Sequence, residues 1–194
     1  GIVPKYMWIP LILTVTCNMV AYFGTRIFTR HWFHHDLTNS FEENIPLIPW
    51  TVTIYFICYI FWVANYVLGS RQDQDTAFRF LSADFLAKII CMIVFLAFPT
   101  TNVRPVIEGT TFWENIMLML YSADAADNLL PSIHCLTSWF GYIAVRKNPQ
   151  IPRWYKLFSV VFALSVCVST LTTKQHVIVD AVVGVALAEV CYWF

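Results

Sequence analysis

Long apolar segments alternate with short polar connections along most of the chain. A helix needs about 20 consecutive, mostly apolar residues to cross the hydrocarbon core of a bilayer. Six stretches approach or reach this length, and we expect each to span a membrane: Met7–Phe23, Ile48–Leu68, Asp84–Phe98, Ser132–Val145, Leu157–Leu171 and Val177–Phe194. The third and fourth are short by this count, so we expect them to extend into their flanks. The pattern predicts an all-α integral membrane bundle of six helices, forming one domain over residues 1–194.

Five polar connections separate the predicted spans: Thr25–Pro46, Gly69–Ser82, Pro99–Leu130, Arg146–Lys156 and Thr172–Gln175. Lysine and arginine are enriched in cytoplasmic loops. The N-terminus and the second and fourth connections hold seven of them: Lys5, Arg71, Arg79, Arg146, Lys147, Arg153 and Lys156. The other three connections hold four: Arg26, Arg30, Arg104 and Lys174. We therefore expect a multi-pass protein with both termini in the cytoplasm.

Composition agrees with a membrane protein. Hydrophobic residues make up 58% of the chain and charged residues only 12%, whereas soluble domains carry roughly 25% charged residues. The formal net charge is zero, which gives no indication of a nucleic-acid partner. The six cysteines are scattered singly, without a CxxC pair, so no cysteine-based metal site is indicated. No small-residue cleavage site follows the first apolar segment, so we expect a span there and not a signal peptide.

Two histidines stand in short polar motifs at the edges of apolar segments. One motif is Pro-Ser-Ile-His, ending at His134, and the other is His-Val-Ile-Val-Asp, from His176 to Asp180. Ionisable residues at membrane depth are costly and are therefore functional candidates. Positions i and i+4 share one face of a helix, so Asp180 can reach back to His176. A carboxylate that holds one ring nitrogen and leaves the other free produces an oriented nucleophile.

A third polar segment, on the same side as both histidine motifs, completes a candidate phosphate site. It follows the third predicted span and contains Arg104. A tetrahedral phosphoryl group needs cations, hydrogen-bond donors, a nucleophile and an acid. The three segments together supply cations and donors at Arg104, Lys174, Ser132, Asn102 and Thr101. Because the two cations can provide the positive charge, we expect neither a metal ion nor another cofactor.

The chain resembles the type 2 phosphatidic acid phosphatase superfamily. The resemblance rests on Arg104-Pro105, on the Pro-Ser-Ile-His motif and on the His-Val-Ile-Val-Asp motif, in this order on six spans. It implies that His176 is the nucleophile that forms a phosphohistidine, with Asp180 as its orienting partner. By the same resemblance, His134 is the general acid. Arg104, Ser132 and Lys174 would hold the phosphoryl oxygens.

Two positions depart from the motifs of that superfamily. The lysine usual seven residues before the arginine is replaced by Ala97, and the Ser-Arg of the third motif is replaced by Ser169-Thr170. Lys174, two residues before His176, would replace the missing cation. This Lys-Gln-His form resembles the branch that includes sphingomyelin and inositol phosphoceramide synthases, which transfer a head group.

Three functions therefore remain open. The first is a metal-independent phosphatase that hydrolyses a lipid phosphomonoester or diphosphate at the extracytoplasmic or luminal face. The second is a head-group phosphotransferase with the same site, and the third is a non-catalytic lipid-binding or transport protein. In each case the partners are membrane lipids, and the oligomeric state stays open. A further cluster, His31, His34, His35 and Asp36, suggests a metal site, but Trp32 and Phe33 within it favour a segment lying in the membrane interface.

Overall fold

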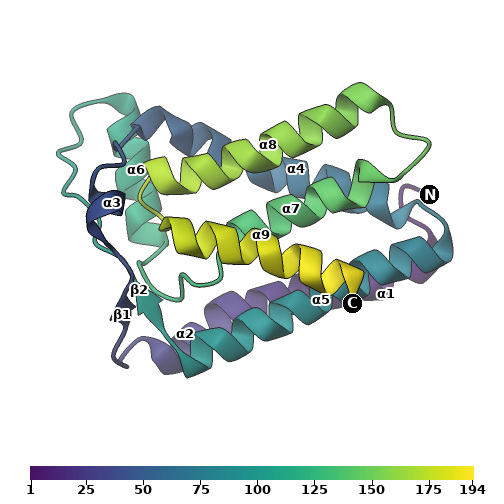
Figure 1. Ribbon diagram of the computed structural model, residues 1–194, viewed down its shortest axis with the longest axis horizontal. Coiled ribbons are helices and arrows are strands. Elements are labelled where there is room, and N and C mark those ends of the chain that lie inside the picture. Colours follow the sequence, from purple (N-terminus) through teal and green to yellow (C-terminus); the bar gives the residue numbers. More distant parts are fainter.

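Helices running side by side along the long dimension of the molecule make up most of the fold (Figure 1). The computed structural model describes residues 1–194. The main helices are α1 (Trp8–Met19), α4 (Val52–Ser70), α5 (Gln74–Ala97), α7 (Ile133–Arg146), α8 (Arg153–Thr172) and α9 (Ile178–Trp193). Short elements complete the chain: η1 (Lys5–Met7), η2 (Val20–Gly24), α2 (Thr25–Thr29), β1 (His35–Asp36), α3 (Ser40–Glu43), η3 (Pro49–Thr51), β2 (Thr100–Thr101) and α6 (Phe112–Ala123). The all-α class predicted from the hydrophobic pattern is confirmed.

Four helical segments are long and apolar enough to cross a membrane: Lys5–Thr29, Pro49–Ser70, Gln74–Ala97 and Arg153–Thr172. They correspond to the first, second, third and fifth predicted spans. The remaining two, α7 and α9, contain 14 and 16 residues. At about 1.5 Å per residue, α7 is about 21 Å long and shorter than a typical hydrocarbon core. Spanning by α7 and α9 therefore stays a prediction.

Several predicted boundaries are wrong, because hydropathy does not register the polar ends of helices. The first span continues to Thr29, and the third extends into its flank, as expected, beginning at Gln74. Asp73 caps this earlier start, its Oδ1 accepting a hydrogen bond from the backbone N–H of Thr76 at 3.0 Å. The loop predicted at Pro99–Leu130 contains α6, which begins with a capping box.

The two ends of the bundle differ in what they carry. The N-terminus, the α4–α5 turn and the α7–α8 loop lie at one end in Figure 1, and α9 runs toward that end. The opposite end holds α3, α6, the strand pair β1–β2 and the beginnings of α7 and α9. Both histidine motifs are therefore at the end away from the chain termini, as the predicted topology requires. Which end faces the cytoplasm stays a prediction.

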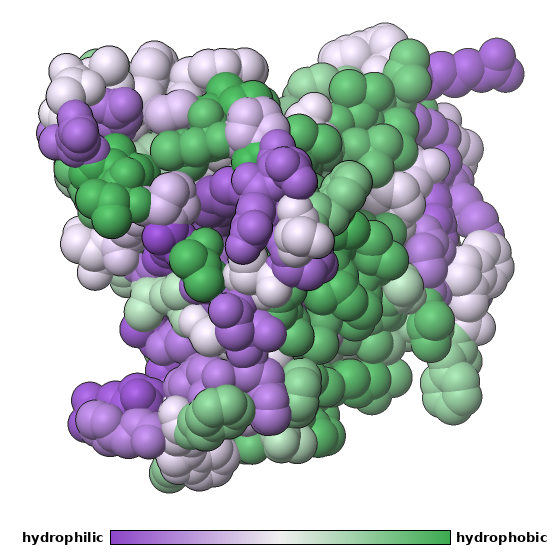
Figure 2. Space-filling model, turned by 60° about the vertical axis from the view of Figure 1, so that its left-hand side comes forward, coloured by the Kyte–Doolittle hydropathy of each residue, from purple (hydrophilic) through white to green (hydrophobic).

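The outer surface of the bundle is largely apolar. Large hydrophobic side chains of α1, α4 and α8 are exposed, among them Ile9, Ile60 and Val161. Figure 2, which turns the histidine-bearing end toward the viewer, shows polar surface over that end, a broad apolar region beside it and further polar surface beyond. An apolar surface between two polar ends is suited to a bilayer.

Helix α7 lies at the centre of the bundle and contacts α4, α5, α8 and α9. Eleven of its 14 residues are buried. It approaches α9 most closely at Gly184, where a Cβ atom would stand 2.7 Å from the backbone oxygen of Ser132. One turn earlier, the backbone N–H of Ser132 donates to the carbonyl of Asp180 at 3.0 Å. The beginnings of α7 and α9 therefore form one hydrogen-bonded unit.

Substituting Gly184 with alanine is expected to destabilise this unit. The added methyl group meets a backbone atom that no side-chain rotation can move, and overpacking of this kind costs about 1–3 kcal/mol. The measurement is the thermal unfolding midpoint in detergent. Gly24→Ala is the matched control, because its Cβ would meet only the side chain of Val20, at 3.3 Å. Equal midpoints for the two variants would contradict the expectation.

Candidate active site

Ser132 determines how α7 begins. Its Oγ accepts a hydrogen bond from the backbone N–H of Cys135 at 3.3 Å, which makes Ser132 the N-cap of the helix. His134 consequently lies in the first turn of α7, buried at the polar end of the bundle. Because the Ser132 hydroxyl is fully buried and makes this capping bond, its direct contribution to the site is to place His134.

His176 and Asp180 make the contact predicted from their spacing. Oδ2 of Asp180 lies 3.3 Å from Nδ1 of His176 and also accepts the backbone N–H of Val177 at 3.0 Å. Asp180 is fully buried and forms the first turn of α9. The carboxylate therefore holds Nδ1 as a donor and leaves Nε2 as the nitrogen with a free lone pair.

The surroundings of His176 favour its protonated form. Burial by itself lowers the pKa of the imidazole, but the hydrogen bond and negative charge of Asp180 outweigh this effect, with further contributions from Cys135 and Asp124. The resulting pKa is above the ordinary histidine value. A neutral, nucleophilic ring is consequently more populated as the pH rises.

The second motif histidine faces the first. The ring centroids of His134 and His176 are 6.0 Å apart, and both residues line a small cavity together with Asp124 and Gln175. Aromatic side chains of α4 surround His134. The hydroxyl of Tyr55 is 3.4 Å from its Nδ1, and the hydroxyl of Tyr59 is 3.3 Å from its Nε2.

Arg104 contacts two residues that line this cavity, Asp124 and Gln175. Its guanidinium donates to the backbone carbonyl of Asp124 and, at 2.6 Å, to Oε1 of Gln175, while Nε has no partner. The ring of Tyr121 lies against it, 4.7 Å from ring centroid to Cζ. Burial lowers the pKa of Arg104 somewhat. No carboxylate forms an ion pair with this cation.

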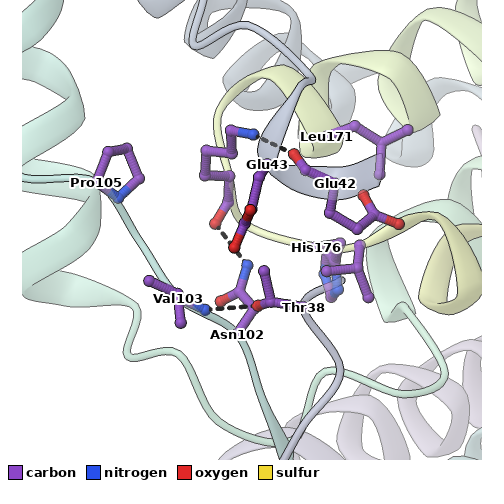
Figure 3. A pocket seen from close by; sticks show the side chains of 10 residues that line it. Thr38, Glu42, Glu43, Asn102, Val103, Pro105, Leu171 and His176 are labelled. Atoms are coloured by element: carbon purple, nitrogen blue, oxygen red, sulfur yellow. Dashed lines mark hydrogen bonds between the residues drawn. The ribbon is translucent and has the colours of Figure 1, made fainter. Parts of the chain in front are cut away.

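A second, larger cavity of about 210 Å³ lies on the other side of His176 (Figure 3). Asn102 and Lys174, two of the residues predicted to contact phosphate, both line it. The amide of Asn102 donates to the carbonyl of Lys174 at 3.0 Å, and Nζ of Lys174 donates to the carbonyl of Glu42 at 2.7 Å. Glu42 in turn accepts the backbone N–H of Ile178 through Oε1, at 2.9 Å. Segment α3 is thereby attached to the beginning of α9.

The structure places the predicted site residue Thr101 outside both cavities. Its Oγ1 donates to the carbonyl of Ala126 at 2.6 Å and lines neither cavity. The residue belongs to β2, and its hydroxyl serves to hold the long loop. A structural role therefore replaces the phosphate contact expected for Thr101.

Several residues that contact the site lie outside the two histidine motifs. Asp124, Gln175, Tyr55, Tyr59 and Glu42 all contact a predicted site residue. Burial raises the pKa of Asp124 to about 6, with the nearby charge of Asp127 adding to the shift and His176 opposing it. Asp127 itself pairs with Arg26 at 3.0 Å. Gln175, directly before His176, and Asp124, in an acidic cluster of the long loop, could be suspected from the sequence.

The cluster of His31, His34, His35 and Asp36 is spread along a segment that is mostly irregular. Nδ1 of His34 contacts the carbonyl of Trp32 at 2.9 Å, and the ring of His35 stacks on Phe98 with centroids 4.2 Å apart. The structure contains no group of three or more histidine, cysteine, aspartate or glutamate side chains that could hold one metal ion. His34 and His35 make local hydrogen-bonding and packing contacts instead.

Comparison with known proteins identifies the family of the chain. A family model described as the PAP2 superfamily matches residues 28–194, which include every candidate site residue. No curated protein matches the sequence at a significant level. The match covers most of the chain, and the membrane-type helices fit it. On this basis the chain belongs to the PAP2 superfamily, whose members are phosphatases or phosphotransferases acting on phosphate esters.

Proposed function

We propose that the protein is a metal-independent lipid phosphate phosphatase. It hydrolyses a lipid phosphomonoester or diphosphate at the extracytoplasmic or luminal face through a phosphohistidine intermediate. The observation that carries the proposal is the pair of facing histidines, 6.0 Å apart between ring centroids, of which His176 is held at Nδ1 by the buried carboxylate of Asp180. This arrangement supplies a nucleophile and a proton donor to opposite sides of one phosphoryl group.

In the first step, Nε2 of His176 attacks phosphorus and forms an N–P bond. The bond from phosphorus to the lipid oxygen breaks, and His134 gives a proton to that oxygen, so the lipid leaves as an alcohol. Asp180 accepts the Nδ1–H hydrogen bond throughout and stabilises the positive charge that develops on the His176 ring. No proton needs to pass to Asp180.

In the second step, water hydrolyses the phosphohistidine. His134, now neutral, removes a proton from the water, whose oxygen attacks phosphorus as the N–P bond breaks. Inorganic phosphate leaves, His176 recovers its lone pair and His134 is protonated again. Both residues thus return to their starting states.

Two cations are available to bind the phosphoryl oxygens. Arg104 and Lys174 hydrogen-bond to neutral carbonyl or amide oxygens, and neither forms an ion pair. Their positive charges are therefore not compensated by a carboxylate contact, and an anionic phosphoryl group can satisfy them. Asn102 adds an amide at the larger cavity.

The direct test is release of inorganic phosphate by the detergent-purified protein from a panel of lipid phosphates in the presence of EDTA. The panel contains phosphatidic acid, phosphatidylglycerophosphate, an isoprenyl diphosphate and a sphingoid base phosphate. We expect release from at least one substrate, lost in His176→Ala and retained in His31→Ala, whose exposed histidine lies outside the site. Release that requires a divalent cation would contradict the metal-independent mechanism.

A second arm distinguishes hydrolysis from transfer. The same assay is repeated with phosphorus-labelled substrate and added acceptor lipids that carry free hydroxyl groups. Label recovered as inorganic phosphate supports the phosphatase. Label recovered on the acceptor would assign the head-group transferase instead, and turnover in neither arm would leave the non-catalytic function.

Replacing Arg104 with alanine is expected to lower kcat/KM by about 10²- to 10³-fold, the usual effect of removing one preorganised donor to a developing anion. Arg104→Lys should recover only part of this loss, because lysine cannot make two parallel hydrogen bonds. Arg71→Ala, at the opposite end of the bundle, is the matched control. An Arg104→Ala enzyme with wild-type kcat/KM would show that the guanidinium does not contact the phosphoryl group.

A further inference from the structure

A continuous hydrogen-bonded chain connects His134 to a second buried carboxylate. The hydroxyl of Tyr55 lies 3.0 Å from Oδ2 of Asp124 and 3.4 Å from Nδ1 of His134. Tyr55 is almost fully buried, and its ring lies against the imidazole with centroids 4.3 Å apart. The contact joins α4, the end of α6 and the first turn of α7, three elements far apart in the chain.

Directions along this chain of hydrogen bonds follow from which atoms can donate. The Oδ2 atom of Asp124, when ionised, only accepts, so the hydroxyl of Tyr55 must donate to it. The phenolic oxygen then has its lone pairs free and accepts from Nδ1–H of His134. The tautomer of His134 is thereby fixed, with Nε2 left as the nitrogen that exchanges protons.

Asp124 is held firmly in this position. It follows the last residue of α6, and its backbone N–H donates to the carbonyl of Leu120 at 2.8 Å. Its own carbonyl accepts from the guanidinium of Arg104. The carboxylate lines the small cavity shared by the two histidines, so its negative charge is close to both rings.

We propose that Asp124 and Tyr55 are positioning residues for the general acid, doing for His134 through one intervening hydroxyl what Asp180 does directly for His176. They keep Nδ1 of His134 protonated and stabilise the imidazolium that donates its Nε2 proton to the departing lipid oxygen. This inference rests on the proposed function. The two histidines thus have separate carboxylates, one at each side of the phosphoryl group.

The leaving group provides the sharpest test. An alkyl alcohol must be protonated as it departs, whereas p-nitrophenolate leaves readily without a proton. If Asp124 and Tyr55 act through His134, their variants lose activity toward alkyl phosphates and keep it toward p-nitrophenyl phosphate. The ratio kcat/KM is the appropriate measure, because it covers the steps up to cleavage of the ester bond and excludes hydrolysis of the phosphohistidine.

Asp124→Asn and Tyr55→Phe are each expected to lower kcat/KM for a short-chain phosphatidic acid by about 10- to 100-fold. General acid–base catalysis contributes roughly 10²- to 10⁴-fold in total, and each variant should lose part of it. For p-nitrophenyl phosphate the loss should stay within about threefold on the same reasoning. Asp124→Glu should restore part of the alkyl activity. Asp75→Asn and Tyr6→Phe, on exposed residues at the other end of the bundle, are the controls.

The possible outcomes separate the two proposals. Equal losses toward both substrates would overturn the positioning role and indicate a general structural effect, and no loss toward either would also overturn it. If the unmodified protein releases phosphate from neither substrate, the proposed phosphatase function itself fails. Circular dichroism and gel filtration of each variant establish that it is folded before its kinetics are compared.

Discussion

Phosphate release is expected to fall by about 10⁴-fold or more when His176 is replaced by alanine, since losing a nucleophile removes the covalent route entirely. Only Nε2 of His176 combines a free lone pair with a ring held at Nδ1 by a buried carboxylate. In the proposed mechanism His134 cannot take over the attack, because its Nε2 carries the proton that goes to the lipid oxygen and its Nδ1 faces the hydroxyl of Tyr55. The effect should be the largest of any single substitution in the chain.

Trapping the covalent intermediate measures this prediction directly. Wild-type protein quenched during turnover of a phosphorus-labelled substrate should carry acid-labile, base-stable label, as expected for a phosphoramidate. His176→Ala should carry none, and His34→Ala, which alters a histidine outside the site, should carry the wild-type amount. If His176→Ala carried as much label as the wild-type protein, the nucleophile would be another residue.

Asp180→Asn is expected to have the second largest effect, a loss of about 10³- to 10⁴-fold in kcat, as for other carboxylates that orient a catalytic histidine. The amide can donate to Nδ1 of His176 and so favours the tautomer with its lone pair directed away from the phosphoryl group. It also removes the negative charge that stabilises the developing imidazolium. Substrate binding, which depends on the cations, should change much less.

The pH dependence of Asp180→Asn gives an independent check. In the unmodified protein the pKa of His176 is raised. In the proposed mechanism the neutral ring attacks, so kcat/KM is expected to fall as the pH drops through that pKa. Burial lowers the pKa and Asp180 raises it, so without the carboxylate the pKa falls, although Asp124 and Cys135 still raise it. The acidic limb of the profile should therefore move to lower pH. A limb at unchanged pH would show that another group controls it.

The features predicted correctly from the sequence are those encoded by neighbouring residues. Apolar runs predicted the long helices because a bilayer imposes a minimum length on them. The contact between His176 and Asp180 followed from helical periodicity alone. Such features need no knowledge of the rest of the fold.

Helix ends were predicted less well, for a physical reason that two elements illustrate. The first turns of α5 contain Arg79, whose guanidinium donates to the carbonyl of Tyr192 at 2.9 Å and is thus satisfied within the protein. A charged residue lowers the local hydropathy, so the hydrophobic pattern predicts a loop at this position. Helix α6 was missed although Thr111 and Glu114 form the capping box that marks its start. Reading capping residues together with hydropathy would have found it.

The surroundings of His134 could not have been predicted from local patterns. Tyr55 and Asp124 are 69 residues apart in the chain, and their contact exists only because α4 and the end of α6 pack beside α7. A tyrosine in an apolar span and an aspartate in a polar loop are each common. Their combined role arises from tertiary packing and becomes visible only in the structure.

The enclosed position of α7 makes the spacing of the two histidines insensitive to membrane thickness. A thicker or thinner bilayer acts on the helices that touch lipid, which adjust their tilt at a cost of fractions of a kcal/mol per Å. Here those helices include α1 and α8, which carry neither histidine of the site, whereas α7 is surrounded by protein and hydrogen-bonded to the start of α9. Tilting of the outer helices changes the gaps through which a lipid reaches the site. Membranes of different composition should therefore alter substrate access and KM, while the rate of the chemical step stays constant.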